Sequence, residues 1–236
     1  MSPLINQRIL VVGGSSGIGF AVAKAAATAG AKVTIGSRSP KKLKEAVEAL
    51  GDVASAVIDT ADEDLIESFF ANSDPWDHIV ITAAQTPSGP VRKLSLDDAK
   101  KAMESKFWGA YRVAKAARLT ERGSLTFVSG FLSERPSGSS VLQGAINAAL
   151  ESLGRGLALE YSPARVNTVS PGLIDTPLWS KMEEGSRNAM FERVAANLPA
   201  KAIGQPTDIA NAVVFLMTTP FATGSTVRVD GGGVIG

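Results

Sequence analysis

Four glycines and two serines lie between an apolar run, residues 9–12, and an alanine-rich segment, residues 20–29. The cluster comprises Gly13, Gly14, Ser15, Ser16, Gly17, Ile18 and Gly19. Glycines let the chain leave a strand in a conformation that a Cβ forbids, and let the backbone approach a phosphate. The free N–H groups and dipole of a following helix attract an anion, and the serine hydroxyls add donors. The spacing G-x-x-x-G-x-G in this context predicts a pyrophosphate site, because a turn without a ligand needs fewer glycines and serines.

The end of the next apolar segment, residues 32–36, carries a second candidate contact with a nucleotide. Proteins that bind NAD place a carboxylate here, which accepts hydrogen bonds from the adenosine ribose. This chain has Ser37 followed by Arg38. No carboxylate repels a 2′-phosphate, and a guanidinium is available for bidentate contact. We therefore predict NADP(H) as the cofactor; the alternative is that Arg38 is a solvated surface residue.

The elements that must position these residues alternate between strand and helix along the chain. We predict strands over 8–13, 32–36, 53–58, 78–82, 124–129, 165–169 and 226–229, and helices over 17–29, 40–50, 62–71, 95–118, 141–160 and 207–217. The pattern predicts a Rossmann-like α/β fold, a doubly wound parallel seven-stranded sheet with helices on both faces, in one domain over 1–236. Right-handed crossovers place strands 8–13 and 78–82 side by side, with a ligand crevice at their carboxyl ends. An excursion over 173–205, with one or two helices, would form a substrate lid.

Composition excludes several classes of function. The 236 residues include 24 basic and 23 acidic side chains, and no basic run favours a nucleic acid partner. The absence of cysteine excludes disulfides and a thiolate nucleophile, and the single histidine, His78, excludes a histidine-rich metal site. No apolar run approaches the ~18 residues of a membrane span, and residues 1–8 lack the apolar stretch of a signal peptide. We expect a cytoplasmic protein with no membrane partner and no metal.

Further motifs resemble those of the short-chain dehydrogenase/reductase family over nearly the whole chain. The glycine cluster resembles the family's glycine motif, and Ile81-Thr82-Ala83-Ala84 stands where the family has Asn-Asn-Ala-Gly. Arg165-Val166-Asn167 followed by Ser170-Pro171-Gly172 is similar to the stretch around the nicotinamide, and Val229-Asp230-Gly231-Gly232 to the carboxyl-terminal signature. The resemblance implies a nicotinamide-dependent oxidoreductase. Its further contacts with the cofactor would come from Asp59 beside the adenine, Thr60, Ala83, Ala84, Asn147, Pro171, Gly172, Ile174 and Thr176.

The resemblance breaks at the residues that the family uses for proton transfer. Members of the family use an Asn, a Ser and a Tyr-x-x-x-Lys; the tyrosine protonates the forming alkoxide, and the lysine binds the nicotinamide ribose. This chain has Gln143 for the tyrosine, Asn147 for the lysine, Lys106 for the asparagine, and Gly130 for the serine, with Ser129 one residue away. An amide donates hydrogen bonds but has no proton to transfer near neutral pH. Because general acid catalysis contributes about 10²–10⁴ in rate, an ordinary ketone reductase of this kind should be poor.

Three functions remain compatible with these residues. The one we favour is an NADP(H)-dependent oxidoreductase with a rearranged site, which passes a hydride to a small carbonyl or imine/iminium substrate. The cationic carbon of an iminium needs no proton, and Lys106 would bind the ribose or act as the acid from the space left at Asn147. Arg135 would hold an anionic substrate group, although both cations also have a plain solvated interpretation. The alternatives are an NADP(H)-binding sensor, scaffold or partner subunit without turnover, and a non-redox cyclase or isomerase.

The resemblance also implies how copies of the chain assemble. Members of the family pair the helices that correspond to 95–118 and 141–160 between subunits. We therefore expect a homodimer or homotetramer that acts on a small-molecule substrate.

Overall fold

The computed structural model describes residues 4–236, so the first three residues of the expected domain lie outside the described range. Seven parallel strands form one sheet in the order β3-β2-β1-β4-β5-β6-β7. The strands are β1 Arg8–Val12, β2 Lys32–Ser37, β3 Ala54–Val57, β4 Trp76–Ile81, β5 Leu119–Val128, β6 Arg165–Pro171 and β7 Thr226–Val229. The sheet confirms the predicted Rossmann-like fold and the pairing of β1 with β4.

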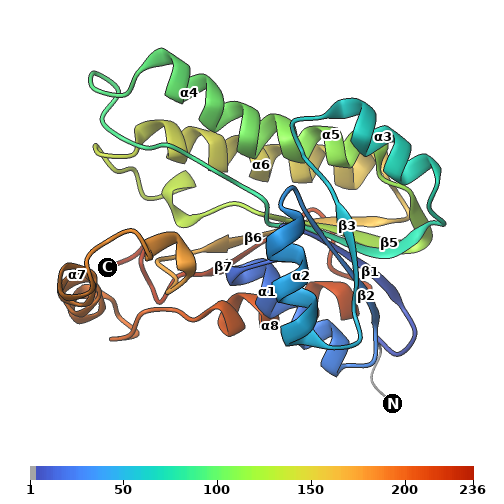
Figure 1. The fold of residues 1–236 in the computed structure, drawn as a ribbon. Helices are drawn as coiled ribbons and strands as arrows, with labels where there is room; N and C mark the ends of the chain where they lie inside the picture. Colours follow the sequence, from blue (N-terminus) through green and yellow to red (C-terminus); the bar gives the residue numbers. More distant parts are fainter. Residues whose placement is uncertain (1–3) are drawn as a thin grey trace.

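Helices cover both faces of the sheet (Figure 1). One face carries α1 Gly17–Thr28, α2 Pro40–Leu50 and α8 Pro206–Thr218; the other carries α3 Glu63–Ala71, α4 Leu96–Met103, α5 Gly109–Ala116 and α6 Val141–Glu160. Ile9 and Val11 of β1 belong to the first core, whereas Leu10 and Val12 belong to the second. A parallel strand covered on both sides therefore reads as a continuous apolar run rather than an alternating one.

Side-chain caps set where several helices begin. Ser39 accepts a hydrogen bond from the N–H of Lys42 at 3.4 Å, with Pro40 in the first turn of α2. Asp62 caps α3 and Ser95 caps α4 in the same way, at 2.9 and 3.0 Å. These caps satisfy N–H groups that have no partner within the helix, so the predicted starts were accurate.

The predicted helix over 95–118 is interrupted in the structure. The π-helix η1, Glu104–Trp108, separates α4 from α5 and contains Lys106. Gly109 follows it, and a Cβ there would lie 2.8 Å from Oγ1 of Thr60, so the helix passes close to the segment after β3. The helical segment ends at Ala116 because β5 begins at Leu119, five residues before the predicted strand, where Leu119 pairs with Trp76.

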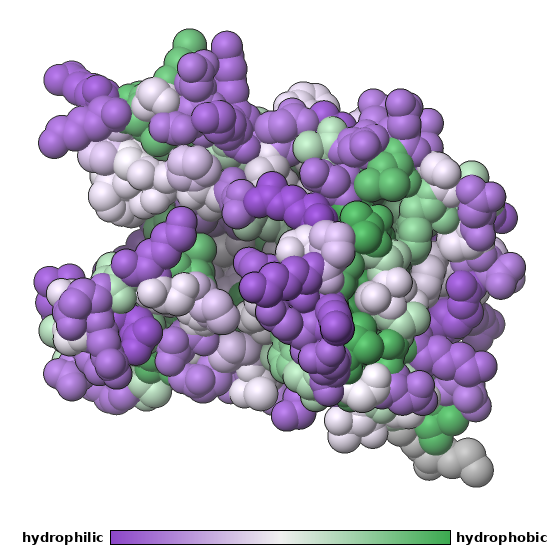
Figure 2. Space-filling view, viewed as in Figure 1, coloured by the Kyte–Doolittle hydropathy of each residue, from purple (hydrophilic) through white to green (hydrophobic). Residues whose placement is uncertain are grey.

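The excursion over 173–205 contains the 3₁₀-helix η3, Pro177–Trp179, and the helix α7, Glu184–Asn197. In Figure 1, α7 lies away from the sheet, beyond the carboxyl ends of the central strands. Figure 2 shows a hollow between α7 and the part of the molecule that carries α4 and α6. No helix within 4–236 is long and apolar enough to cross a membrane.

Candidate active site

The turn between β1 and α1 is packed so tightly that a Cβ on Gly13 or Gly19 would force neighbouring atoms to move. Gly13 has a φ of 93°, and a Cβ on it would lie 2.5 Å from the nitrogen of Ala83. A Cβ on Gly19 would lie 2.2 Å from the carbonyl oxygen of Gly13. Ser16 begins α1 without a side-chain cap, so the first-turn N–H groups are not satisfied by its hydroxyl. This helix start has the features of a dinucleotide phosphate site, an uncapped amino end and a backbone bare of side chains.

The other predicted cofactor residues surround this turn. Ser15 donates to Ser37 at 3.2 Å between their hydroxyl oxygens, which joins the turn to the end of β2. A Cβ on Gly17 would lie 3.5 Å from the Cβ of Thr176, so the segment after β6 lies over the turn. Ala83 donates its N–H to the carbonyl of Val12 at 3.1 Å.

The remaining predicted contacts lie at the edges of this region. Asp59 accepts a hydrogen bond from the N–H of Ala61, and the carbonyl of Thr60 accepts from Arg112. Gly172 donates its N–H to Val229 at 2.9 Å, beside the buried Pro171. Ile18 and Ile174 pack in the core below, and Ala84 is exposed. Arg38 is exposed and has no hydrogen bond or ion pair to the rest of 4–236, so its guanidinium is available to an anion.

Lys106 is the buried cation of the site. Its side chain leaves η1 and is 7% exposed, and its Nζ donates to Oδ1 of Asn147 at 2.6 Å and to the carbonyl of Ser129 at 2.7 Å. Burial lowers the pKa of Lys106 to about 8, and the negative charge of Glu151 opposes part of that shift. The ammonium has three donors, so one remains for a further partner.

Asn147 occupies the space that a side chain at position 130 would need. A Cβ on Gly130 would lie 2.7 Å from Nδ2 of Asn147. Ser129 does not move into that place, because its N–H continues the strand ladder to Val169 at 2.9 Å. The Ser129 hydroxyl is buried and donates to Oε1 of Glu151 at 2.8 Å.

Sequence reasoning missed Glu151, which is also 7% exposed. Its Oε1 accepts a second hydrogen bond from the hydroxyl of Ser133 at 2.7 Å. Glu151 comes four residues after Asn147 and eight after Gln143, so all three lie on one face of α6. An acidic residue at the same helical spacing as Gln143 and Asn147 was the signal that could have identified it.

Gln143 and Arg135 differ in whether their side chains make hydrogen bonds within the protein. Gln143 lies in the first turn of α6, half-buried, and makes no hydrogen bond to another residue of the described chain. Arg135 donates to the carbonyl of Gly233, so part of its hydrogen-bonding capacity holds the carboxyl-terminal segment. The amide of Gln143 is therefore free for a ligand, whereas Arg135 would have to share its donors.

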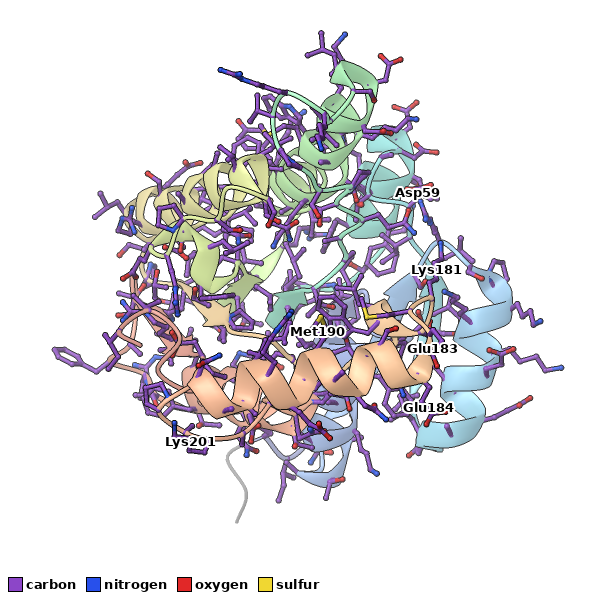
Figure 3. The ribbon with its side chains drawn as sticks, turned by 90° about the vertical axis from the view of Figure 1, so that its left-hand side faces the viewer. Asp59, Lys181, Glu183, Glu184, Met190 and Lys201 are labelled. Carbon is purple, nitrogen blue, oxygen red and sulfur yellow. The ribbon has the colours of Figure 1, made fainter. Side chains whose placement is uncertain are left out.

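The helix α7 borders the hollow. In Figure 3 it begins at Glu184, on the side of Asp59, and runs toward Lys201, which follows its end at Asn197, and the Met190 side chain rises from it toward the hollow. No residue of α7 is fully buried, and its half-buried apolar residues Met190, Phe191, Val194 and Ala195 recur at helical spacing. Trp179 of η3 packs edge-on against Phe191 with ring centroids 6.3 Å apart. The apolar stripe of α7 therefore packs against η3 through Phe191, and its Met190 lies toward the hollow.

Residues 12–233 match the family model described as enoyl-(acyl carrier protein) reductase. The chain is 35% identical to the short-chain dehydrogenase/reductase ATR9 of Stachybotrys chlorohalonatus, over 98% of both chains. It is 33% identical to the short-chain dehydrogenase/reductase fsr5 of Gibberella fujikuroi, over 98% of this chain and 96% of the relative.

Solved structures of similar proteins superpose over almost the whole chain. One is a small-chain dehydrogenase in complex with NADPH, with a TM-score of 0.86, 34% identity, and coverage of 98% of this chain and 100% of that one. Another is the MalC reductase/Diels-Alderase of Malbranchea aurantiaca, with a TM-score of 0.91, 29% identity, and coverage of 100% and 99%.

Proposed function

The chain belongs to the short-chain dehydrogenase/reductase family, and on that premise we propose that it is an NADP(H)-dependent oxidoreductase with a rearranged active site. Its substrate is a small molecule, preferably an imine that reacts as its iminium cation, rather than a ketone. The observation that carries this proposal is the Lys106–Asn147 pair, 2.6 Å apart, at the two positions where the family resemblance expects asparagine and lysine. The two residue types have changed places, and a buried ammonium still lies at the site.

The bound cofactor supplies the hydride, and the residues of this chain hold it and the substrate. The glycine turn and the amino end of α1 bind the pyrophosphate. The remaining N–H of the Lys106 ammonium, together with the Asn147 amide, binds the nicotinamide ribose. Gln143 donates a hydrogen bond to the substrate and orients it, without giving up a proton.

This division of roles determines the preferred substrate. Hydride addition to a ketone produces an alkoxide that must gain a proton, whereas addition to an iminium carbon produces a neutral amine. A site whose tyrosine is replaced by Gln143 lacks the usual proton donor. Reduction of a ketone therefore proceeds without its general acid, whereas reduction of an iminium does not need one. The apolar stripe of α7 favours a substrate with an apolar body.

The first test compares a cyclic iminium with the ketone of the same ring by NADPH absorbance. We expect turnover of the iminium to exceed that of the ketone by about 10²-fold or more, since general acid catalysis is worth that much. Lys106→Ala and Gln143→Ala should each lower iminium turnover about tenfold or more, which is ~1.4 kcal/mol of transition-state stabilisation. Lys101→Ala, at an exposed lysine of the preceding helix, is the control. Equal rates for the wild type and both site variants would exclude the rearranged site.

The second test concerns the 2′-phosphate. We infer that Arg38 binds it, because this guanidinium is free and the neighbouring Ser37 carries no charge. Arg38→Ala should raise the Kd for NADPH about tenfold or more and leave the Kd for NADH unchanged, as measured by cofactor fluorescence. An equal loss for the two cofactors would remove the proposed role of Arg38.

A second candidate function is a cyclisation without net redox change. One similar structure is that of a protein called a reductase/Diels-Alderase, so its name couples reduction with a cycloaddition. A crevice with an apolar wall and amide donors can hold a reactive intermediate in a folded shape. Product formation at constant NADPH absorbance would favour this function, and cofactor binding without any product would favour a sensor or partner subunit.

A further inference from the structure

Two buried side chains of opposite charge hold Ser129 from opposite sides. The hydroxyl of Ser129 donates to Oε1 of Glu151 at 2.8 Å, and its carbonyl accepts from Nζ of Lys106 at 2.7 Å. Ser133 adds a second hydrogen bond to the same carboxylate at 2.7 Å. The carboxylate therefore holds both ends of the turn that contains Gly130, and the ammonium holds the residue before it.

The surroundings offer Lys106 no other counter-charge. Among the buried residues of 4–236, the remaining ionisable side chains are His78 and Arg165. His78 is in β4 and Arg165 begins β6, at the amino ends of the strands. Arg165 donates there to carbonyls of α8.

The acidic residue of η1, Glu104, is paired with another side chain. Glu104 of η1 pairs with Arg112 of α5 at 2.5 Å, and its side chain is 43% exposed. The segment that follows β5 contributes the carbonyl and hydroxyl of Ser129, which carry no charge. The face of α6 toward the site contributes Asn147, which is neutral, and Glu151. Glu151 is therefore the buried acid that can balance Lys106.

We propose that Glu151 is a positioning residue of the active site, which keeps Lys106 as an ammonium and fixes the turn around Gly130 through Ser129 and Ser133. An isolated ammonium in a buried site is costly, so removal of the carboxylate favours the neutral amine. A neutral Lys106 loses one of its donors and part of its attraction for the oxygens of Asn147 and Ser129. The consequence for cofactor binding rests on the proposed function, but the charge coupling does not.

The experiment measures the proton affinity of Lys106 in the protein without cofactor. The free energy of unfolding is recorded from pH 6 to 10.5 for the wild type and for Lys106→Met. Because the pKa of Lys106 is about 8 in the folded state and 10.5 in the unfolded state, the unfolded chain binds more protons between these values. The wild type therefore gains stability relative to Lys106→Met as the pH rises above about 8.

Glu151→Gln keeps the shape of the side chain and an oxygen that can accept from both serines, but removes the charge. In the Glu151→Gln background, we expect Lys106 to begin to raise the free energy of unfolding, relative to Lys106→Met, at a pH about one unit lower or more. The reason is that loss of a nearby opposite charge lowers the pKa of a lysine by about that much. Glu160→Gln, at an exposed glutamate of the same helix, should leave the onset near pH 8. An unchanged onset in Glu151→Gln would overturn the proposal.

A second comparison applies if Glu151→Gln is too unstable to titrate. Adding Lys106→Met to Glu151→Gln removes the unpaired ammonium. The double variant should therefore regain most of the melting temperature that Glu151→Gln alone loses. No recovery would mean that the two residues are not coupled, and the proposal would be wrong. Titration of the wild type with NADPH separates the two proposals, because absent binding would refute the proposed function while the pH dependence would still report on Glu151.

Discussion

His78 occupies a fully enclosed place in β4. Its Nδ1 lies 2.8 Å from the hydroxyl of Ser124 and its Nε2 lies 2.6 Å from Oε1 of Gln7. Burial lowers the pKa of His78 to about 4, with a further contribution from the positive charge of Arg165. The ring is therefore neutral in the folded protein at pH values where it is protonated in the unfolded chain.

This difference predicts a loss of stability in mild acid. Between pH 6.5 and 4 the unfolded state binds the proton and the folded state does not, so the free energy of unfolding falls as the pH falls. At pH 4 the contribution of His78 should be smaller than at pH 7 by about 3 kcal/mol. Urea denaturation of the wild type and His78→Gln at both pH values measures it. A constant difference between the two proteins would contradict the prediction.

The residues of the candidate site could be named from the sequence to different extents. Lys106 and Asn147 were predicted to share a space because both fall on positions of one family motif, and the structure places Nζ 2.6 Å from Oδ1. Glu151 could not be deduced from that motif, since the family resemblance assigns nothing to its position. Its burial depends on Ser129 and Ser133, whose approach is a property of the folded turn after β5.

At the scale of elements, the glycine turn is the part that sequence predicted best. A Cβ on Gly19 would lie 2.2 Å from the Gly13 carbonyl oxygen and 2.5 Å from Oγ1 of Thr82, so the turn and the end of β4 are in direct contact. Thr82 itself donates to the carbonyl of Val12 at 3.1 Å. The start of α1 is therefore fixed by close packing with two neighbouring strands.

Gly19→Ala tests whether this packing serves the cofactor. We expect the variant to lose about 1–3 kcal/mol of stability through overpacking, and to bind NADPH about tenfold more weakly or worse because the first turn of α1 must move. Gly156→Ala is the matched control, since a Cβ there meets nothing within 4 Å and alanine favours a helix. Thermal unfolding and cofactor fluorescence measure the two effects. Unchanged NADPH affinity in Gly19→Ala would show that the close packing of the turn is not needed for cofactor binding.

The π-helix shows where prediction of elements fails. The segment 95–118 has helical composition throughout, and the extra residue in the turn at Glu104–Trp108 leaves no periodic signature in so short a stretch. Such turns often lie at functional sites, and this one carries Lys106 into the core. The early start of β5 was missed for a different reason: residues 119–123 include polar side chains, and their strand is set by pairing with Trp76.

At the scale of the whole molecule, the topology was predictable because the sheet type and the hand of each crossover connection each have one strongly favoured arrangement. Apolar runs buried on both faces, separated by helices, require a parallel sheet, and right-handed crossovers then place β1 beside β4. The single domain over 1–236 and the assembly of copies stay predictions. The sequence shows which residues are apolar, but which of them stay exposed for a second copy to cover depends on the folded chain.

We propose that the face of η1 and α5 pairs with a second copy of the chain. Trp108 and Tyr111 are 44% and 42% exposed and pack edge to face with ring centroids 5.6 Å apart, next to Phe107. Exposed aromatic clusters of this kind are typical of protein interfaces. We expect light scattering to give the mass of a dimer or tetramer, and Trp108→Glu to halve it by burying a charge in the interface.

Leu178→Glu provides the control for this prediction. Leu178 is 76% exposed in η3, within the excursion over 173–205 and not on the α4–α6 side, so its variant should keep the mass of the wild type. Because Trp108 is two residues from Lys106 along the same π-helix, dissociation should also loosen the site and weaken NADPH binding. A monomeric wild type would exclude the interface. An unchanged mass of the Trp108→Glu variant would mean that the interface lies on another surface.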